Sequence, residues 1–103
     1  MSIQSTLLQI TASNIYVSSG NSVVSTMYFC NTYTAAVDLN VFVMSNGNNI
    51  ANATTQIYSN IQLASNDTYV ADWEKLVLGP GDIIKANATV ANVVNATISY
   101  VGI

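Results

Sequence analysis

The chain has 103 residues, of which 50% are apolar and 7% are charged, whereas about a quarter of the residues in an average soluble domain are charged. Its net charge is −3, and its two cations, Lys75 and Lys85, are too few to neutralise a nucleic-acid backbone. We therefore expect a single domain that binds no nucleic acid and associates readily, because little surface charge keeps copies apart.

Catalysis, membrane insertion and metal binding are also not expected. The chain contains no histidine, so the usual general base near neutral pH is missing. No apolar run reaches the ~18 residues of a membrane span, and no secretory signal is recognisable. Cys30 is the single cysteine, so zinc lacks a ligand set, and the apolar neighbours of Cys30 predict a small buried side chain. We expect no cofactor.

The first elements along the chain are apolar. Residues 1–12 contain Ile3, Leu7 and Leu8, and two interpretations stay open for them: an edge strand, or an assembly arm laid on another subunit. Residues 22–31 are rich in β-branched and aromatic side chains on both faces, which predicts a central strand with Tyr28 in the core.

Residues 37–44 show the period-two alternation of a half-buried strand. The valines and the leucine at odd-numbered positions are predicted to face the core, which leaves Phe42 and Met44 on the outward face. The short link at residues 31–35 predicts an antiparallel hairpin between this strand and the preceding one.

The middle of the chain alternates between loops and strands. Residues 45–53 are rich in asparagine and predict an exposed loop. A strand is expected over residues 57–63, a turn over residues 64–68 and a short strand over residues 68–72.

Residues 74–88 predict a strand, a Gly-Pro-Gly turn and a second strand. An alternative for residues 71–78 is one turn of helix, because Trp73, Leu76 and Val77 are at helical spacing. The closing strand is expected over residues 93–103.

The carboxylates are assigned to turns rather than to chemistry. Asp67 lies in an Asn-Asp-Thr turn and Asp82 follows Gly81, and at both positions an Asp side chain commonly accepts hydrogen bonds from its own turn. No stretch has the acidic spacing of a calcium loop.

Several short strands separated by turn signals predict an all-β fold: one antiparallel β-sandwich domain of six to eight strands over residues 1–103, either immunoglobulin-like or jelly-roll-like.

The order of short segments resembles that of small structural (virion) proteins of tailed bacteriophages, of the kind found in cyanophages and marine phages. The resemblance rests on residues 14–21 (NIYVSSGN), 29–31 (FCN), 37–43, 64–70, 74–78 (EKLVL), 81–84 (GDII) and 95–103 (NATISYVGI). It implies a non-enzymatic virion component that forms a symmetric homo-oligomer and contacts other virion proteins. Such a component is a capsid cement or decoration subunit, or a subunit of the neck, tail or baseplate.

Six apolar residues are the candidate interface residues. They come from the N-terminal segment, from the outward face of the alternating strand and from the tryptophan, whose side chain commonly anchors interfaces: Ile3, Leu7, Leu8, Phe42, Met44 and Trp73. For Phe42 and Met44 an alternative stays open, in which a second sheet or the N-terminal segment of the same chain covers their side chains. The alternative function is a receptor- or carbohydrate-binding module that uses the asparagine-rich loop.

Overall fold

The computed structural model describes residues 2–45, 56–71 and 76–102 of the chain. Every regular element in these ranges is a β-strand. The nine strands are β1 (Ser2–Leu7), β2 (Ser13–Val17), β3 (Ser22–Asn31), β4 (Val37–Met44), β5 (Gln56–Leu63), β6 (Thr68–Ala71), β7 (Leu76–Leu78), β8 (Ile83–Ala88) and β9 (Val94–Gly102).

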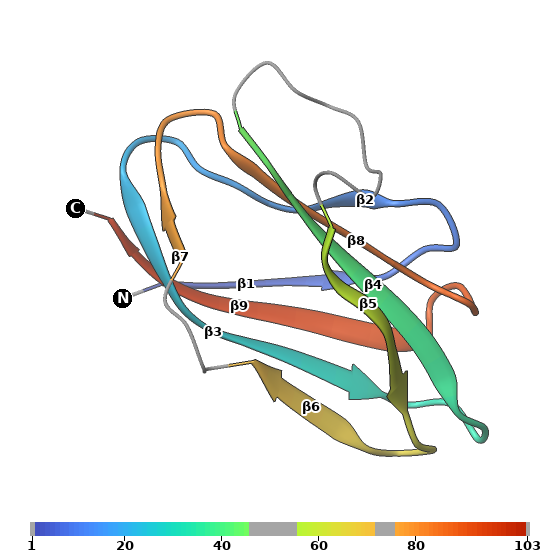
Figure 1. Ribbon diagram of the computed structural model, residues 1–103. Coiled ribbons are helices and arrows are strands. Elements are labelled where there is room, and N and C mark those ends of the chain that lie inside the picture. Colours follow the sequence, from blue (N-terminus) through green and yellow to red (C-terminus); the bar gives the residue numbers. More distant parts are fainter. Residues whose placement is uncertain (1, 46–55, 72–75, 103) are drawn as a thin grey trace.

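The strands form two antiparallel sheets that pack face to face (Figure 1). Sheet A has the order β1-β9-β3-β6, and β7 also pairs with β3. Sheet B has the order β2-β8-β4-β5. The predicted antiparallel β-sandwich is therefore confirmed, and β1 is an edge strand of sheet A.

Strand order identifies the type of sandwich. β9 pairs with β3 along the whole length of β3, so β6 and β7 share the opposite side of β3 and count as one edge position. From one strand position to the next along the chain, the described strands change sheet every time except between β4 and β5. Eight strand positions wrapped in this way are the double-sheet jelly-roll arrangement. The jelly-roll alternative, rather than the immunoglobulin-like one, is therefore the one realised.

The nine described strands exceed the expected six to eight, and β2 is the strand that the sequence did not reveal. A register shift between Asn14 and Tyr16 buries two successive side chains, Ile15 and Tyr16. A bulge of this kind breaks the alternation by which a strand is recognised.

Two predicted connections differ from the structure. The link after β3 makes no hairpin, because β3 lies in sheet A and β4 in sheet B. The Gly-Pro-Gly turn likewise joins β7 of sheet A to β8 of sheet B, so the two strands around it do not pair. Residues 76–78 are a strand and not helical. Both links are arches across the sandwich, which the local turn signal does not distinguish from hairpins.

The buried side chain of Asn31 explains the crossing from β3 to β4. Its Nδ2 donates hydrogen bonds to the carbonyl oxygens of Ala35 (3.0 Å), Leu63 (3.2 Å) and Ala64 (3.1 Å), and its Oδ1 accepts one from the Tyr33 backbone N–H (2.9 Å). Asn31 is 0% exposed. One amide thus bonds backbone groups of the β3–β4 crossing and of the β5–β6 crossing, where the Ala64 carbonyl also accepts a hydrogen bond from the Asp67 N–H at 3.1 Å.

A bulge in β3 decides which of its side chains face solvent. Val24 pairs with Tyr100 but Thr26 pairs with Ser99, so Ser25 is the extra residue. Beyond the bulge the alternation is reversed, and Tyr28 is 42% exposed on the outer face of sheet A instead of lying in the core. Cys30 is half-buried on the same face rather than fully buried.

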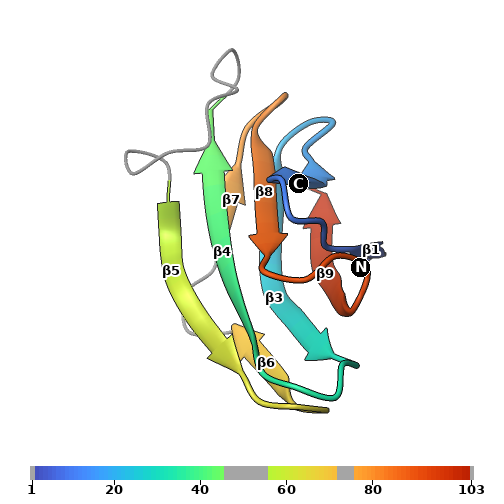
Figure 2. The same ribbon diagram turned by 90° about the vertical axis from the view of Figure 1, so that its right-hand side faces the viewer.

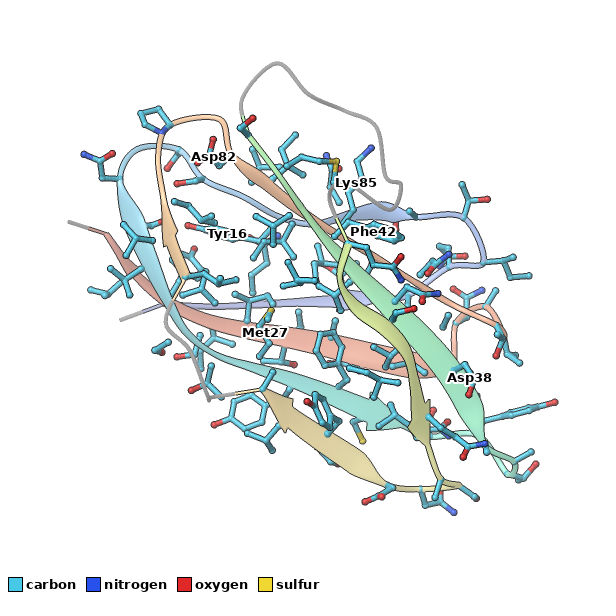
Figure 3. The ribbon with its side chains drawn as sticks, viewed as in Figure 1. Tyr16, Met27, Asp38, Phe42, Asp82 and Lys85 are labelled. Atoms are coloured by element: carbon cyan, nitrogen blue, oxygen red, sulfur yellow. The ribbon has the colours of Figure 1, made fainter. Side chains whose placement is uncertain are left out.

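The core between the sheets is apolar with one polar corner. Tyr16 and Met27 point into this space (Figure 3). The Tyr16 ring lies 4.6 Å from the Tyr100 ring between centroids, and the Tyr16 hydroxyl donates to Ser22 Oγ at 2.9 Å. Ser22 Oγ in turn lies 2.8 Å from Ser18 Oγ. No buried side-chain nitrogen or oxygen of the described residues lacks a partner.

Asn31→Ala is predicted to lower the free energy of unfolding by about 2–3 kcal/mol, because it removes the three hydrogen bonds that the buried amide donates to carbonyls of two crossings. Asn14→Ala, on an exposed position of β2, is the matched control and should change stability by less than about 0.5 kcal/mol. Urea unfolding of both variants measures the difference. Equal midpoints for the two would show that the Asn31 amide does not hold the crossings.

Candidate assembly surface

The six candidate interface residues fall into three groups. Ile3 and Leu7 are 70% and 44% exposed on β1 and are available to a partner. Leu8, Phe42 and Met44 are 0%, 8% and 0% exposed, so their prediction as exposed interface residues is wrong. Trp73 lies outside the described residues.

Leu8 is buried because it follows the last residue of β1 and turns into the core. Its backbone N–H donates to the Val94 carbonyl at 2.9 Å, and its side chain belongs to the core cluster with Val94 and Ile98. Side chains alternate along an extended segment, so Leu8 faces inward where Leu7 faces outward.

Phe42 and Met44 do face away from the main core, as the alternation predicts, but their own chain covers them. Opposite them on β8 are Lys85 and Ile83, and Gln56 of β5 pairs with Phe42 on the other side. Figure 3 shows Phe42 and Lys85 close together beside β4 and β8. These two side chains therefore stabilise the subunit.

The outer face of sheet A is the largest surface without charge that the strand pairings define. Cross-strand partners and the burial alternation place the following residues on it: Ile3, Ser5, Leu7, Val23, Thr26, Tyr28, Cys30, Thr68, Val70, Val77, Asn95, Thr97, Ser99 and Val101. None of these described residues is charged. We call this surface the uncharged face.

Exposed apolar side chains are spread across the whole uncharged face. Besides Ile3, Leu7 and Tyr28, the exposed fractions are 69% for Val77, 39% for Val70 and 37% for Val101. Tyr28 and Val70 are direct cross-strand partners, as are Val23 and Val77. Monomeric proteins rarely expose extended apolar surface, so such a face is typical of an interaction site.

The polar groups between these side chains bond to one another. Ser5 Oγ lies 3.1 Å from Thr97 Oγ1, which donates to Asn95 Oδ1 at 2.7 Å. Ser25 Oγ donates to the Ser99 carbonyl at 3.1 Å. Because these hydroxyls already have partners within the face, a surface packed against it needs few polar groups of its own.

The outer face of sheet B has a different character. An amide chain crosses it: Gln56 Nε2 donates to Asn40 Oδ1 (2.8 Å), and Asn40 Nδ2 donates to Asn87 Oδ1 (3.1 Å). Asp38 and Lys85 also lie on this face. Sheet B thus presents charged groups and a chain of amides, whereas the described residues on the outer face of sheet A carry no charge.

Two of the described carboxylates, Asp67 and Asp82, accept hydrogen bonds within turns. Asp67 Oδ1 accepts a hydrogen bond from the Thr68 N–H at 2.8 Å, and Asp82 Oδ2 accepts one from the Gly79 N–H at 2.8 Å, which confirms both predicted turn roles. Gly81, with φ of 81°, completes the second turn. In the described part of the chain no three His, Cys, Asp or Glu side chains cluster as metal ligands would.

Two further findings concern membrane-spanning helices and the alternative binding function. Over residues 2–45, 56–71 and 76–102 there is no helix of the length and apolarity that a membrane crossing requires. The asparagine-rich loop of the alternative binding function falls, apart from Ser45, outside the described residues. Tyr33 is 38% exposed in the connection after β3.

No family model matches the chain, and neither curated proteins nor solved structures give a significant match to it. The functional argument therefore rests on the fold and on the uncharged face.

Met44→Ala is predicted to lower the free energy of unfolding by about 2–4 kcal/mol, because it opens a cavity where a fully buried side chain packs. Ile10→Ala, which truncates a side chain that is 62% exposed, should change stability by less than about 0.5 kcal/mol. Thermal and urea unfolding at low protein concentration compare the two. A Met44→Ala variant as stable as the wild type would mean that Met44 is not packed within its own subunit.

Proposed function

We propose that this protein is a non-enzymatic structural subunit of a tailed-phage virion, and that its copies associate with one another and with other virion proteins through the uncharged face. The observation that carries the proposal is the contrast between the two sheets. Charged groups are depleted in the buried centre of protein interfaces, and apolar and tyrosine side chains are enriched there.

The composition of the whole chain supports the same conclusion. With 7% charged residues, the protein has little electrostatic repulsion to prevent contact between copies. A surface of this kind is a liability for a free monomer, whereas in a permanent assembly it is covered.

The virion assignment rests on the resemblance of the segment order to small phage structural proteins, and the fold is compatible with it. Jelly rolls occur in viral capsid domains and also in lectins, so the fold by itself is an analogy and not a function. A capsid cement or decoration subunit and a neck, tail or baseplate subunit share the same requirement, namely a stable fold with one face suited to neighbouring subunits.

Substitution of a charge into the uncharged face should weaken self-association at least tenfold. Val70→Lys and Val77→Lys each place an ammonium group where a neighbouring subunit is expected, and burial of an unpaired charge is costly. Val17→Lys is the matched control, because Val17 is 47% exposed on β2 of sheet B. Sedimentation velocity measures the mass of each variant. If both sheet A variants keep the wild-type mass, the uncharged face is not the assembly surface.

The virion assignment has a separate test. Mass spectrometry of density-purified particles of the phage that encodes the chain should detect it in many copies per particle. If the chain is absent from the particles and the purified monomer binds a glycan saturably, the structural assignment is wrong. That result would support the alternative function, a carbohydrate-binding module.

A further inference from the structure

We propose that β1 is an intermolecular edge: it pairs antiparallel with β1 of a second copy, about a two-fold axis through Ser5, so that two A sheets become one continuous sheet. This inference rests on the proposed function, because it specifies how copies of the structural subunit meet.

The backbone of β1 has one open side. Among the described residues β1 pairs only with β9, and Figure 2 shows β1 at the end of its sheet beyond β9. The Leu8 N–H points to the Val94 carbonyl, at 2.9 Å. Backbone groups alternate in direction along an antiparallel strand, so the N–H and C=O groups of Ile3, Ser5 and Leu7 point to the open side.

The other edges of the sandwich carry features that hinder pairing, and β1 does not. β2 has a register shift against β8, and β5 has two against β4. The remaining edge of sheet A changes register against β3 between β6 and β7, because Met27 pairs with Ala71 but Val24 pairs with Leu76. β1 pairs with β9 over six residues without a shift, and it contains no proline and no charge. Charges, prolines and bulges are the usual protection of an edge strand.

Strand β1 is already fixed in position within the single subunit. Gln4 Nε2 donates a hydrogen bond to the Ile15 carbonyl at 3.0 Å, which ties β1 to β2 of the opposite sheet. A strand that is ordered in advance loses little conformational entropy on pairing.

The partner that fits this edge is a second copy, because the sequence of β1 is self-complementary. The open backbone groups belong to odd-numbered residues, so hydrogen-bonded pairing must match odd positions with odd positions. Within β1, a two-fold axis at Ser5 does so with the largest number of hydrogen-bonded pairs, and it sets Ile3 opposite Leu7 of the second copy. Both side chains are exposed on the uncharged face.

This pairing satisfies the open edge and enlarges the face. Three hydrogen-bonded residue pairs supply about six backbone hydrogen bonds, and the two Ile–Leu contacts flank the pair of Ser5 hydroxyls. Strand addition of this kind derives affinity from the main chain. The product is one sheet whose outer face, on both copies, lacks charge at the described residues, and the oligomer contains an even number of copies.

Cross-linking through introduced cysteines tests the register. In a Cys30→Ser background, Ser5→Cys should form a covalent dimer on mild oxidation or with a short thiol-reactive linker. Across the axis the two Cα atoms are about 5.5 Å apart in a hydrogen-bonded pair, within the range of a disulfide. Thr97→Cys, the neighbour of Ser5 on β9, is the matched control and should not cross-link, because two further strand spacings of about 4.8 Å separate its copies.

A mixing experiment tests the direction of the strands. Ile3→Cys and Leu7→Cys, also without Cys30, should each stay uncross-linked alone but yield a mixed dimer when combined. Only an antiparallel pairing centred on Ser5 brings these two positions together. A dimer formed by either variant alone, to the same extent as by the mixture, would overturn the proposed register.

Ser5→Pro provides a readout that needs no cross-linking. Its ring removes only the N–H on the open side, so pairing with β9 and the fold should be retained, as circular dichroism would check. Self-association should weaken at least tenfold. If the wild type oligomerises but Ser5→Pro keeps its mass and Ser5→Cys does not cross-link, β1 pairing is refuted and the proposed assembly remains. If the wild type is a monomer throughout, both proposals fail.

Discussion

The buried amide of Asn31 is the interaction on which the arrangement of the two sheets depends. A chain that leaves one sheet for the other loses its ladder partners, so the backbone groups at the crossing need hydrogen-bond partners of another kind. Asn31 donates to carbonyls on both the β3–β4 and the β5–β6 crossings, so one side chain fixes two sheet changes. With these fixed, β3 and β6 stay side by side in sheet A, and the uncharged face is assembled from strands that are distant in sequence.

The same constraint explains why the two outer faces differ. Sheet A joins strands whose outward positions carry Ser, Thr and apolar residues, and its hydroxyls bond along the face. Sheet B joins strands whose outward positions carry amides, Asp38 and Lys85. One face is thus suited to solvent or polar contacts, and the other is suited to a neighbouring subunit. In the proposed assembly the open edge at β1 pairs with a second copy, and the uncharged face contacts neighbouring subunits.

The sequence predicted the strands with regular alternation and the turns with distinctive chemistry. The strand at residues 37–44 and the turn roles of Asp67 and Asp82 are examples. It did not predict features that depend on a bulge or on long-range contacts. Ser25 reverses the faces of β3 and exposes Tyr28, while the partners of Asn31 turn an expected hairpin into an arch. The N-terminal sequence itself predicts Ile3 and Leu7 as surface residues. Val70 and Val77 are placed on the same face only by the long-range pairing of β6 and β7 with β3.

The mass of the purified chain in solution, measured by light scattering over a range of concentrations and at low and high salt, tests the central claim most directly. A face without charge that is buried between copies predicts a discrete oligomer that is insensitive to salt, because screening acts on charged contacts and not on apolar ones. Two-fold pairing of β1 makes its number of subunits even. A monomer at every concentration, or an oligomer that dissociates at high salt, would contradict assembly through the uncharged face of sheet A.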